Sequence, residues 1–138
     1  MTAPENHITV NHGSMAVNVP RDLFRGIDAE LVDDKVIEFR SMMKKRYPWL
    51  SDGSLDVLLR NARKEMLRVM DEESGGRSTS KRLSSQGKHS MAIEHMIEHL
   101  NEDPDDADGW YTLGELYFKA GKVDEGYKAM NRGRSLIK

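Results

Sequence analysis

Residues 108–117 have the sequence DGWYTLGELY, in which the apolar side chains recur at helical spacing. Trp110, Leu113 and Tyr117 follow one another at steps of three and four residues, which places them on one stripe of an α-helix. Gly114 lies beside this stripe, where the lack of a side chain lets a second helix approach closely. Gly121 ends the helix, because glycine adopts positive φ at little cost. The stretch therefore predicts a helix packed against a neighbouring helix.

A comparison of the sequence with itself extends this prediction to the rest of the C-terminal half. One displacement of the sequence brings Gly87-Lys88 onto Gly121-Lys122, and it also brings Ala92 onto Gly126 and Met96 onto Met130. We call this displacement the repeat shift. Pro104 closes the first of the two units, because proline cannot continue a helix. Helices are thus expected over 88–101, from about Trp110 to Tyr117, and from about Val123 to Leu136.

The repeat shift, about 34 positions long, and the W-x2-L-G-x2-Y pattern of residues 110–117 resemble the tetratricopeptide repeat family. The resemblance covers residues 88–138. It implies a helix-turn-helix unit that binds protein partners, with no cofactor and no catalysis. Within the family, the segment HLNEDPDDADGW at 99–110 is most similar to members that assist cytochrome c maturation and nitrite-reductase assembly.

Two departures from the family pattern affect the expected stability. The upstream repeat has Gly76, Thr79, Ser80 and Leu83 where the pattern has tryptophan, leucine, glycine and tyrosine, so its first helix is expected to be degenerate or missing. About one and a half repeats then remain. Gly126 and Gly133 stand where the family prefers alanine, and each glycine weakens a helix by about 1 kcal/mol. The last helix is therefore expected either to pack unusually closely or to fray.

The resemblance also implies a concave groove lined by the first helix of each repeat. The residues at the matching positions are Asp108, Tyr111, Glu115, Phe118 and Lys119. Tyrosine and phenylalanine supply rigid contact area, and the two carboxylates favour a basic or amide-donating partner segment. The alternative is that both aromatic rings cover the neighbouring helix and that the carboxylates are only solvated.

The N-terminal half has a different organisation. Residues 1–21 show no sustained period and are expected to be a flexible leader. Apolar steps of three and four predict helices from Asp33 to about Tyr47 and over 55–72, so 22–73 is expected to form a helical hairpin. Serine, glycine and basic residues dominate 74–87, which is expected to be a linker. The hairpin is expected to dock on the helix at 88–101 and to cap the repeat domain, 88–138.

The charge distribution supports an alternative function. Residues 40–88 carry 12 Lys/Arg and 6 Asp/Glu, a net charge of +6 between two acidic ends. A basic middle can contact phosphate groups, so the alternative is a nucleic-acid-binding protein or a structural subunit of a secretion apparatus or virion. The candidate phosphate contacts are Lys44, Lys45, Arg46, Arg60, Lys64 and Arg68. Solvated helix faces would produce the same charges.

The segment HMIEH, from His95 to His99, matches the H-x-x-E-H motif of a group of zinc peptidases. The spacing puts both imidazoles on one helix face, but a third ligand is not evident. Since the repeat accounts for the same segment, we expect neither a metal site nor an enzyme.

Composition restricts the remaining classes. The chain of 138 residues has no cysteine, which excludes disulfides and thiolate chemistry. It also lacks an apolar run long enough for a signal peptide or a membrane span. These observations favour a soluble, cytoplasmic, all-α adaptor or assembly factor that recognises a peptide or helix of a protein partner.

Overall fold

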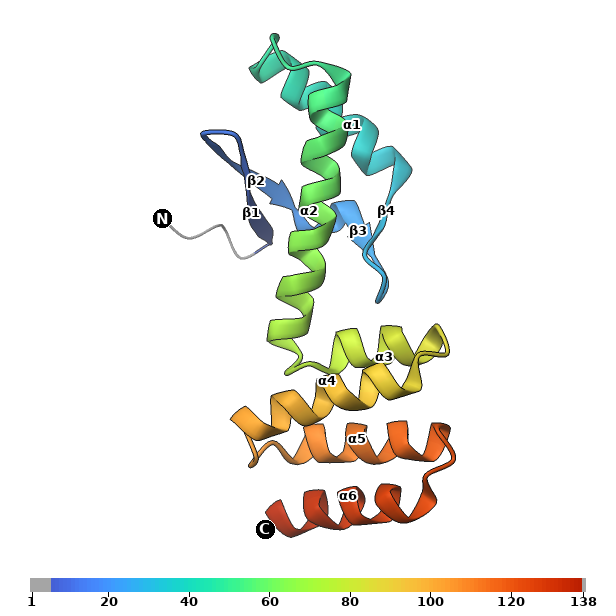
Figure 1. Cartoon of the computed structure of the whole chain (residues 1–138). Coiled ribbons are helices and arrows are strands. Elements are labelled where there is room, and N and C mark those ends of the chain that lie inside the picture. Colours follow the sequence, from blue (N-terminus) through green and yellow to red (C-terminus); the bar gives the residue numbers. More distant parts are fainter. Residues whose placement is uncertain (1–5, 138) are drawn as a thin grey trace. The chain divides into compact units, whose positions relative to one another are not determined.

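The computed structural model describes residues 6–137, and within them the protein is predominantly α-helical with two small strand pairs (Figure 1). Contacts divide the chain into two compact units, residues 1–69 and 70–138. The division falls inside helix α2 (Asp52–Glu73), and so before the segment 74–87 that was expected to separate the domains.

The first unit begins with a β-hairpin, although a flexible leader was predicted over 1–21. Strands β1 (His7–His12) and β2 (Met15–Pro20) pair antiparallel, with Val10 opposite Val17. Alternate apolar residues of both strands are buried, and Gly13 adopts a φ of +61° in the tight turn. This alternation around a two-residue Gly-Ser turn is a hairpin signal that outweighs the polar composition. Residues 1–5 of the predicted leader lie outside the described residues.

Two further helices follow, at the positions where the sequence predicted helices within 22–73. The elements are a 3-10 turn η1 (Arg21–Leu23), the paired strands β3 (Phe24–Arg25) and β4 (Glu30–Leu31), and helices α1 (Asp33–Arg46) and α2. The two short strands depart from the all-α expectation. Helix α1 buries Phe39 and Met43, and α2 buries Leu55, Leu58 and Leu59. The stripes that predicted these helices therefore face the core.

The second unit is a stack of four helices (Figure 1). They are α3 (Arg77–Ser85), α4 (His89–Glu102), α5 (Ala107–Lys119) and α6 (Val123–Leu136). Each helix packs against the next in chain order. The last three lie where the sequence predicted them, whereas α3 occupies the segment 74–87 that was predicted to be a linker.

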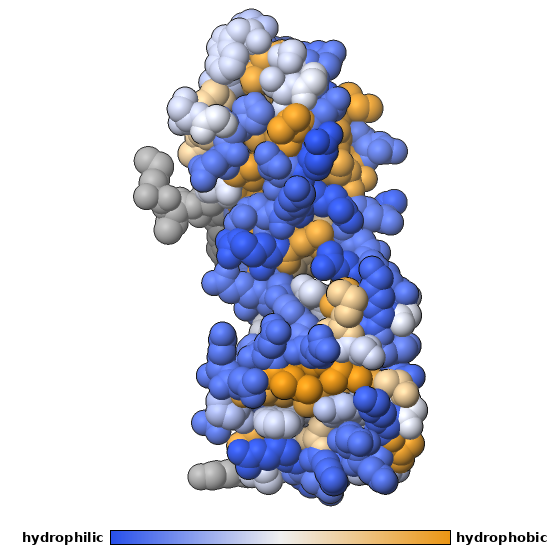
Figure 2. Space-filling view, viewed as in Figure 1, coloured by the Kyte–Doolittle hydropathy of each residue, from blue (hydrophilic) through white to orange (hydrophobic). Residues whose placement is uncertain are grey.

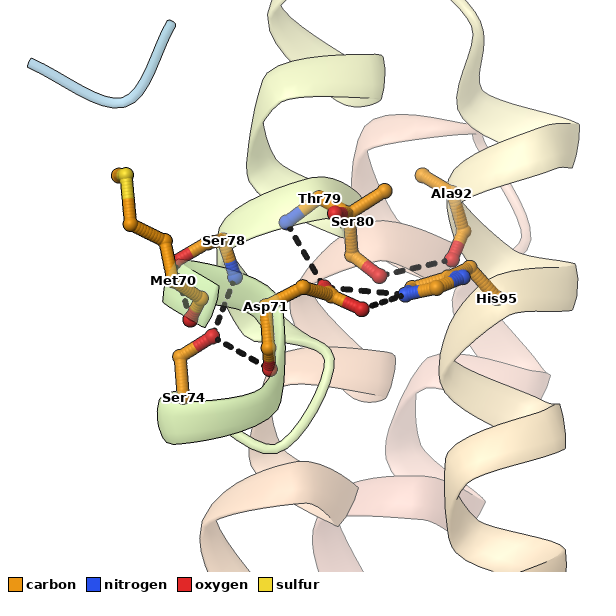
Figure 3. Close-up of polar contacts among 8 residues, drawn as sticks. All are labelled: Met70, Asp71, Ser74, Ser78, Thr79, Ser80, Ala92 and His95. Atoms are coloured by element: carbon orange, nitrogen blue, oxygen red, sulfur yellow. Dashed lines mark hydrogen bonds and ion pairs between the residues drawn. The ribbon is translucent and has the colours of Figure 1, made fainter. Parts of the chain in front are cut away.

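Helix α3 forms despite its low helix propensity because neighbouring side chains satisfy its first N–H groups. The Ser78 N–H donates to Ser74 Oγ at 2.9 Å, and the Thr79 N–H donates to Asp71 Oδ1 at 3.2 Å (Figure 3). On its inner side the fully buried Ser80 donates its hydroxyl to the Ala92 carbonyl of α4 at 3.2 Å. The upstream repeat thus has a short first helix, which the sequence indicated as degenerate or missing.

The two helical hairpins, α3–α4 and α5–α6, have the same local geometry at positions related by the repeat shift. Gly87 and Gly121 adopt φ values of +77° and +78° in their turns. The residue after each glycine closes the turn in the same way: the Lys88 N–H donates to the Leu83 carbonyl at 2.9 Å, and the Lys122 N–H donates to the Tyr117 carbonyl at 2.8 Å. The sequence period is therefore a structural period within residues 77–136.

The glycines of α6 lie at its closest contacts with α5. A Cβ on Gly126 would stand 2.5 Å from the Phe118 ring, and a Cβ on Gly133 would stand 3.1 Å from the Ala107 carbonyl oxygen. Gly114 of α5 is equally crowded, with a Cβ position 3.0 Å from the Gly126 carbonyl oxygen. The sequence left two outcomes open for α6, close packing or fraying, and the structure shows close packing.

The core of the second unit is continuous across the helices of the stack. Its buried members are Ala92, Ile93, Met96, Leu100, Leu113, Leu116 and Ala129, with Leu83, Trp110, Tyr117 and Ala120 packed against them. Leu83 comes from α3, so all four helices contribute to one core. The repeats bury their apolar faces mutually, which is how repeat units gain stability.

Candidate functional site

The five residues predicted to line a groove all belong to α5, and the structure divides them into two kinds. Asp108, Glu115 and Lys119 are exposed. Tyr111 and Phe118 are half-buried against α6: the Tyr111 ring lies 3.4 Å from the Cβ position of Gly133, and the Phe118 ring makes an edge contact with Tyr127 at 5.1 Å between centroids. The aromatic rings therefore cover the neighbouring helix, as the alternative interpretation held.

Helix α3 carries residues at positions equivalent to those of α5, and these residues were not predicted from the sequence. Under the repeat shift, Lys81 matches Glu115 and Arg77 matches Tyr111. Lys81 is exposed, and Arg77 is partly buried beside Asp106. The contacts that form this helix come from side chains outside it: Ser74 accepts the Ser78 N–H, and Asp71 accepts the Thr79 N–H.

A cluster of histidines and carboxylates joins the end of α2 and the start of α3 to α4. His95 Nε2 lies 2.9 Å from Asp71 Oδ2, and the other Asp71 oxygen accepts the Thr79 N–H (Figure 3). The Asp71 carboxylate thus serves two groups, the imidazole on α4 and the first turn of α3. Its geometry is that of a structural cap.

A second pair repeats this arrangement at α5. His99 Nε2 lies 2.8 Å from Asp106 Oδ2, while Asp106 Oδ1 accepts the Gly109 N–H at 3.1 Å and so caps α5. Arg77 Nη1 stands 3.7 Å from the same carboxylate. Burial acts to raise the pKa of Asp106, but hydrogen bonds from His99 and Gly109 and the charges of Arg77 and His99 outweigh it and hold this pKa below its usual value.

A shallow pocket of about 290 Å³ lies beside the two histidines. It is lined by Asp71, Glu72, Gly75, Gly76, His95, Glu98, His99 and Glu102. Ligand atoms of His99, Asp103 and Asp106 come within 4.8 Å of one another, close enough to share a cation. Arg77 and the capping bond to Gly109 already occupy the Asp106 carboxylate, which opposes a cation there. The H-x-x-E-H histidines thus each hold a helix-capping carboxylate.

Asp106→Ala is expected to lower the free energy of unfolding by about 1–2 kcal/mol, because the α5 cap and the His99 partner are lost together. In the wild type this contribution is present above the unfolded-state pKa of about 3.9 and is lost as the pH falls through the lower folded-state pKa. Urea denaturation at pH 7 and below pH 4 measures both effects. Equal destabilisation by Asp105→Ala, an exposed neighbour, would contradict the assignment.

The six candidate phosphate contacts, all in the first unit, are not equivalent in the structure. Lys44 forms an ion pair with Asp52, and Arg68 forms one with Glu65 at 2.6 Å. Lys45, Arg46, Arg60 and Lys64 are exposed. Two of the six cations are therefore at least partly neutralised by carboxylates within the unit.

Comparisons of this chain with protein-family models, with curated proteins and with solved structures give no match. Among residues 6–137, the helices are all too short or too polar to cross a bilayer.

Proposed function

We propose that the protein is a non-enzymatic adaptor or assembly factor, and that a protein partner binds the surface of α3 and α5 in the second unit. The observation that carries the proposal is the helix-turn-helix geometry that α3–α4 and α5–α6 share at positions related by the repeat shift. We infer that these two hairpins are tetratricopeptide-like repeats, a kind of unit whose common role is to hold partner segments.

The exposed charges of this surface support a partner that is itself charged. Lys81 on α3 and Asp108, Glu115 and Lys119 on α5 are exposed, and these are positions at which the repeats face outward. The α5 carboxylates favour a segment with basic or amide groups. Figure 2 shows an apolar band across the second unit at the level of α4 and α5. Exposed apolar surface is typical of interaction sites.

The second candidate is nucleic-acid binding through the first unit. Four exposed cations, Lys45, Arg46, Arg60 and Lys64, favour it. Arg46 stacks over the Tyr47 ring at 5.8 Å, and Trp49 nearby is 69% exposed. Exposed aromatic rings beside cations are a feature of single-strand binding surfaces. The partial neutralisation of Lys44 and Arg68 weakens this candidate relative to the adaptor.

Photo-cross-linking in extract from the source cell tests the adaptor proposal. A benzophenone amino acid is placed at Lys81, at Glu115 or, as a matched control, at the exposed Glu94 on α4. We expect the same protein to be captured at Lys81 and Glu115 and not at Glu94. The same amino acid at Lys45 or Lys64 tests the second candidate. Capture of nucleic acid at these positions that added salt abolishes would support nucleic-acid binding instead.

A further inference from the structure

A groove lies between strand β2 and helix α1 in the first unit. It consists of two adjoining cavities, of about 280 Å³ and about 380 Å³, which share His7, Pro20 and Met42 as lining residues. The first cavity reaches Ala16 and Asn18 on β2, and the second continues beyond Pro20 to the 3-10 turn η1. We call the two cavities together the β2–α1 groove. Because it extends past the end of β2, an extended chain can pass through it.

Strand β2 presents an unpaired backbone edge to this groove. Among residues 6–137, β2 pairs with β1 alone. The Arg21 N–H donates to the Asn6 carbonyl at 2.9 Å, and the hydrogen-bonded residues of an antiparallel pair alternate from such a point. Val17 therefore bonds to β1, whereas Ala16 and Asn18 direct their N–H and C=O groups away from it. Both residues line the groove, so these backbone groups are placed to pair with a further strand.

The α1 side of the groove is apolar and adaptable. Met42 borders both cavities and is 44% exposed, and the thioether side chain of methionine fits partners of varied shape. Met43 and Val17, which are both buried, line the first cavity as well. A segment paired with β2 places one side chain opposite Val17 and on the same side of the sheet. This position therefore favours an apolar side chain.

The charge of the first cavity favours an acidic segment. Its lining includes Arg46 and His7 and, among the described residues, no carboxylate. Lys44 on the same helix is held in an ion pair by Asp52, whereas Arg46 forms no ion pair within residues 6–137 and lies over the Tyr47 ring at 5.8 Å. The Arg46 guanidinium is thus available to a carboxylate of a partner. The second cavity carries charges of both signs and adds no preference.

We propose that an extended segment of a partner protein adds a third strand at β2, with an apolar side chain opposite Val17 and an adjacent acidic side chain that pairs with Arg46. An extended backbone matches the outward N–H and C=O groups of Ala16 and Asn18. Pro20 has no N–H, so the pairing is confined to this short stretch and the affinity is low. The acid is a side chain and not a chain terminus, because the groove extends beyond the paired stretch. This inference does not depend on the proposed partner surface of α3 and α5.

NMR titration of the isotope-labelled full chain tests the proposal. The probe is a capped pentapeptide in which a central valine is flanked by two glutamates and then by two threonines. We expect the amide signals of Ala16 and Asn18 to move in a saturable manner. N-methylation of the two glutamate amides, which face β2 in this pairing, is expected to weaken binding about tenfold or more. N-methylation of the valine amide, which faces away, is the matched control and is expected to change binding by less than about twofold.

Charge reversal in the protein tests the acidic preference. Arg46→Glu is expected to weaken binding of the glutamate peptide about tenfold or more, and to favour a peptide with lysine in place of both glutamates. Arg60→Glu makes the same change of charge at an exposed position on α2 outside the groove, and is expected to leave binding within about twofold of wild type. Circular dichroism melts of each variant establish that the fold is retained.

Several results would overturn the proposal. They are the absence of shifts at Ala16 and Asn18 at millimolar peptide, equal binding by Arg46→Glu and Arg60→Glu, and tolerance of N-methylation at the glutamate amides. Two further probes test the kind of ligand: a peptide whose only carboxylate is its C-terminus, and oligodeoxythymidine. If either shifted the Ala16 and Asn18 amides at lower concentration than the glutamate peptide does, the assignment to an acidic extended segment would be wrong.

Discussion

Met96→Ala is expected to lower the free energy of unfolding of the second unit by about 2–5 kcal/mol. The Met96 side chain is 0% exposed and belongs to the core that joins α4 to α5. Truncation removes most of its buried volume, and the surrounding helices can collapse only partly. Chemical denaturation followed by circular dichroism measures the change.

Two further methionines serve as controls for this prediction. Met130 occupies the position equivalent to Met96 under the repeat shift but is only half-buried, so Met130→Ala is expected to cost less. Met91 is 53% exposed, and Met91→Ala is expected to change stability by less than about 0.5 kcal/mol. Similar losses for Met96→Ala and Met91→Ala would show that α4 does not pack as described.

Gly114→Val is expected to destabilise the second unit by about 1–3 kcal/mol. A Cβ on Gly114 would stand 2.9 Å from Met130 Cγ and 3.0 Å from the Gly126 carbonyl oxygen. The methionine can move, but the carbonyl belongs to the backbone of α6, so the two helices must separate. The loss outweighs the gain in helix propensity, which is less than about 1 kcal/mol.

The control for this variant has the opposite expected sign. Gly53 of α2 has only Ser51 Oγ near its Cβ position, at 3.8 Å. Gly53→Ala is therefore expected to stabilise the helix by up to about 1 kcal/mol. If Gly114→Val also raised the unfolding midpoint in urea, the close contact between α5 and α6 would be wrong.

The helices with regular apolar stripes could be predicted from the sequence. In α1, α2 and the three helices from α4 to α6, steps of three and four residues are reinforced by turn signals such as Pro48, Gly87 and Gly121. The same residues form the core, because a stripe of this kind has to be buried. Period and turn signals together were therefore sufficient for these elements.

Helix α3 could not be predicted because its stability comes from tertiary contacts. Its nine residues, RSTSKRLSS, contain one large apolar side chain, and serine favours caps and turns over helix interiors. The decisive contacts are with residues outside the helix: Asp71 Oδ1 accepts the Thr79 N–H, and the Ser80 hydroxyl donates to the Ala92 carbonyl. The β-hairpin has a weak sequence signal for a different reason, since the alternation of Ile8, Val10, Val17 and Val19 is confined to two strands of six residues.

The exposure of the candidate site residues could be predicted only in part. Exposure of Asp108, Glu115 and Lys119 follows from their spacing on α5, which puts them off the apolar stripe. For Gly126 and Gly133 of α6, by contrast, the sequence does not indicate which side chains fill the space beside each glycine. Tyr111 and Phe118 do so, and only the packing of the helices shows it.

We propose that the α3–α5 surface binds a protein partner, and charge reversal on that surface tests this claim most directly. Tagged full-length protein is used to recover partners from source-cell extract, with Asp108→Lys/Glu115→Lys compared with Glu94→Lys/Glu125→Lys, which makes the same change of charge on α4 and α6. We expect the first variant to lose the protein recovered by wild type and the second to retain it. Equal recovery by both variants, each with a wild-type melting curve, would contradict the claim.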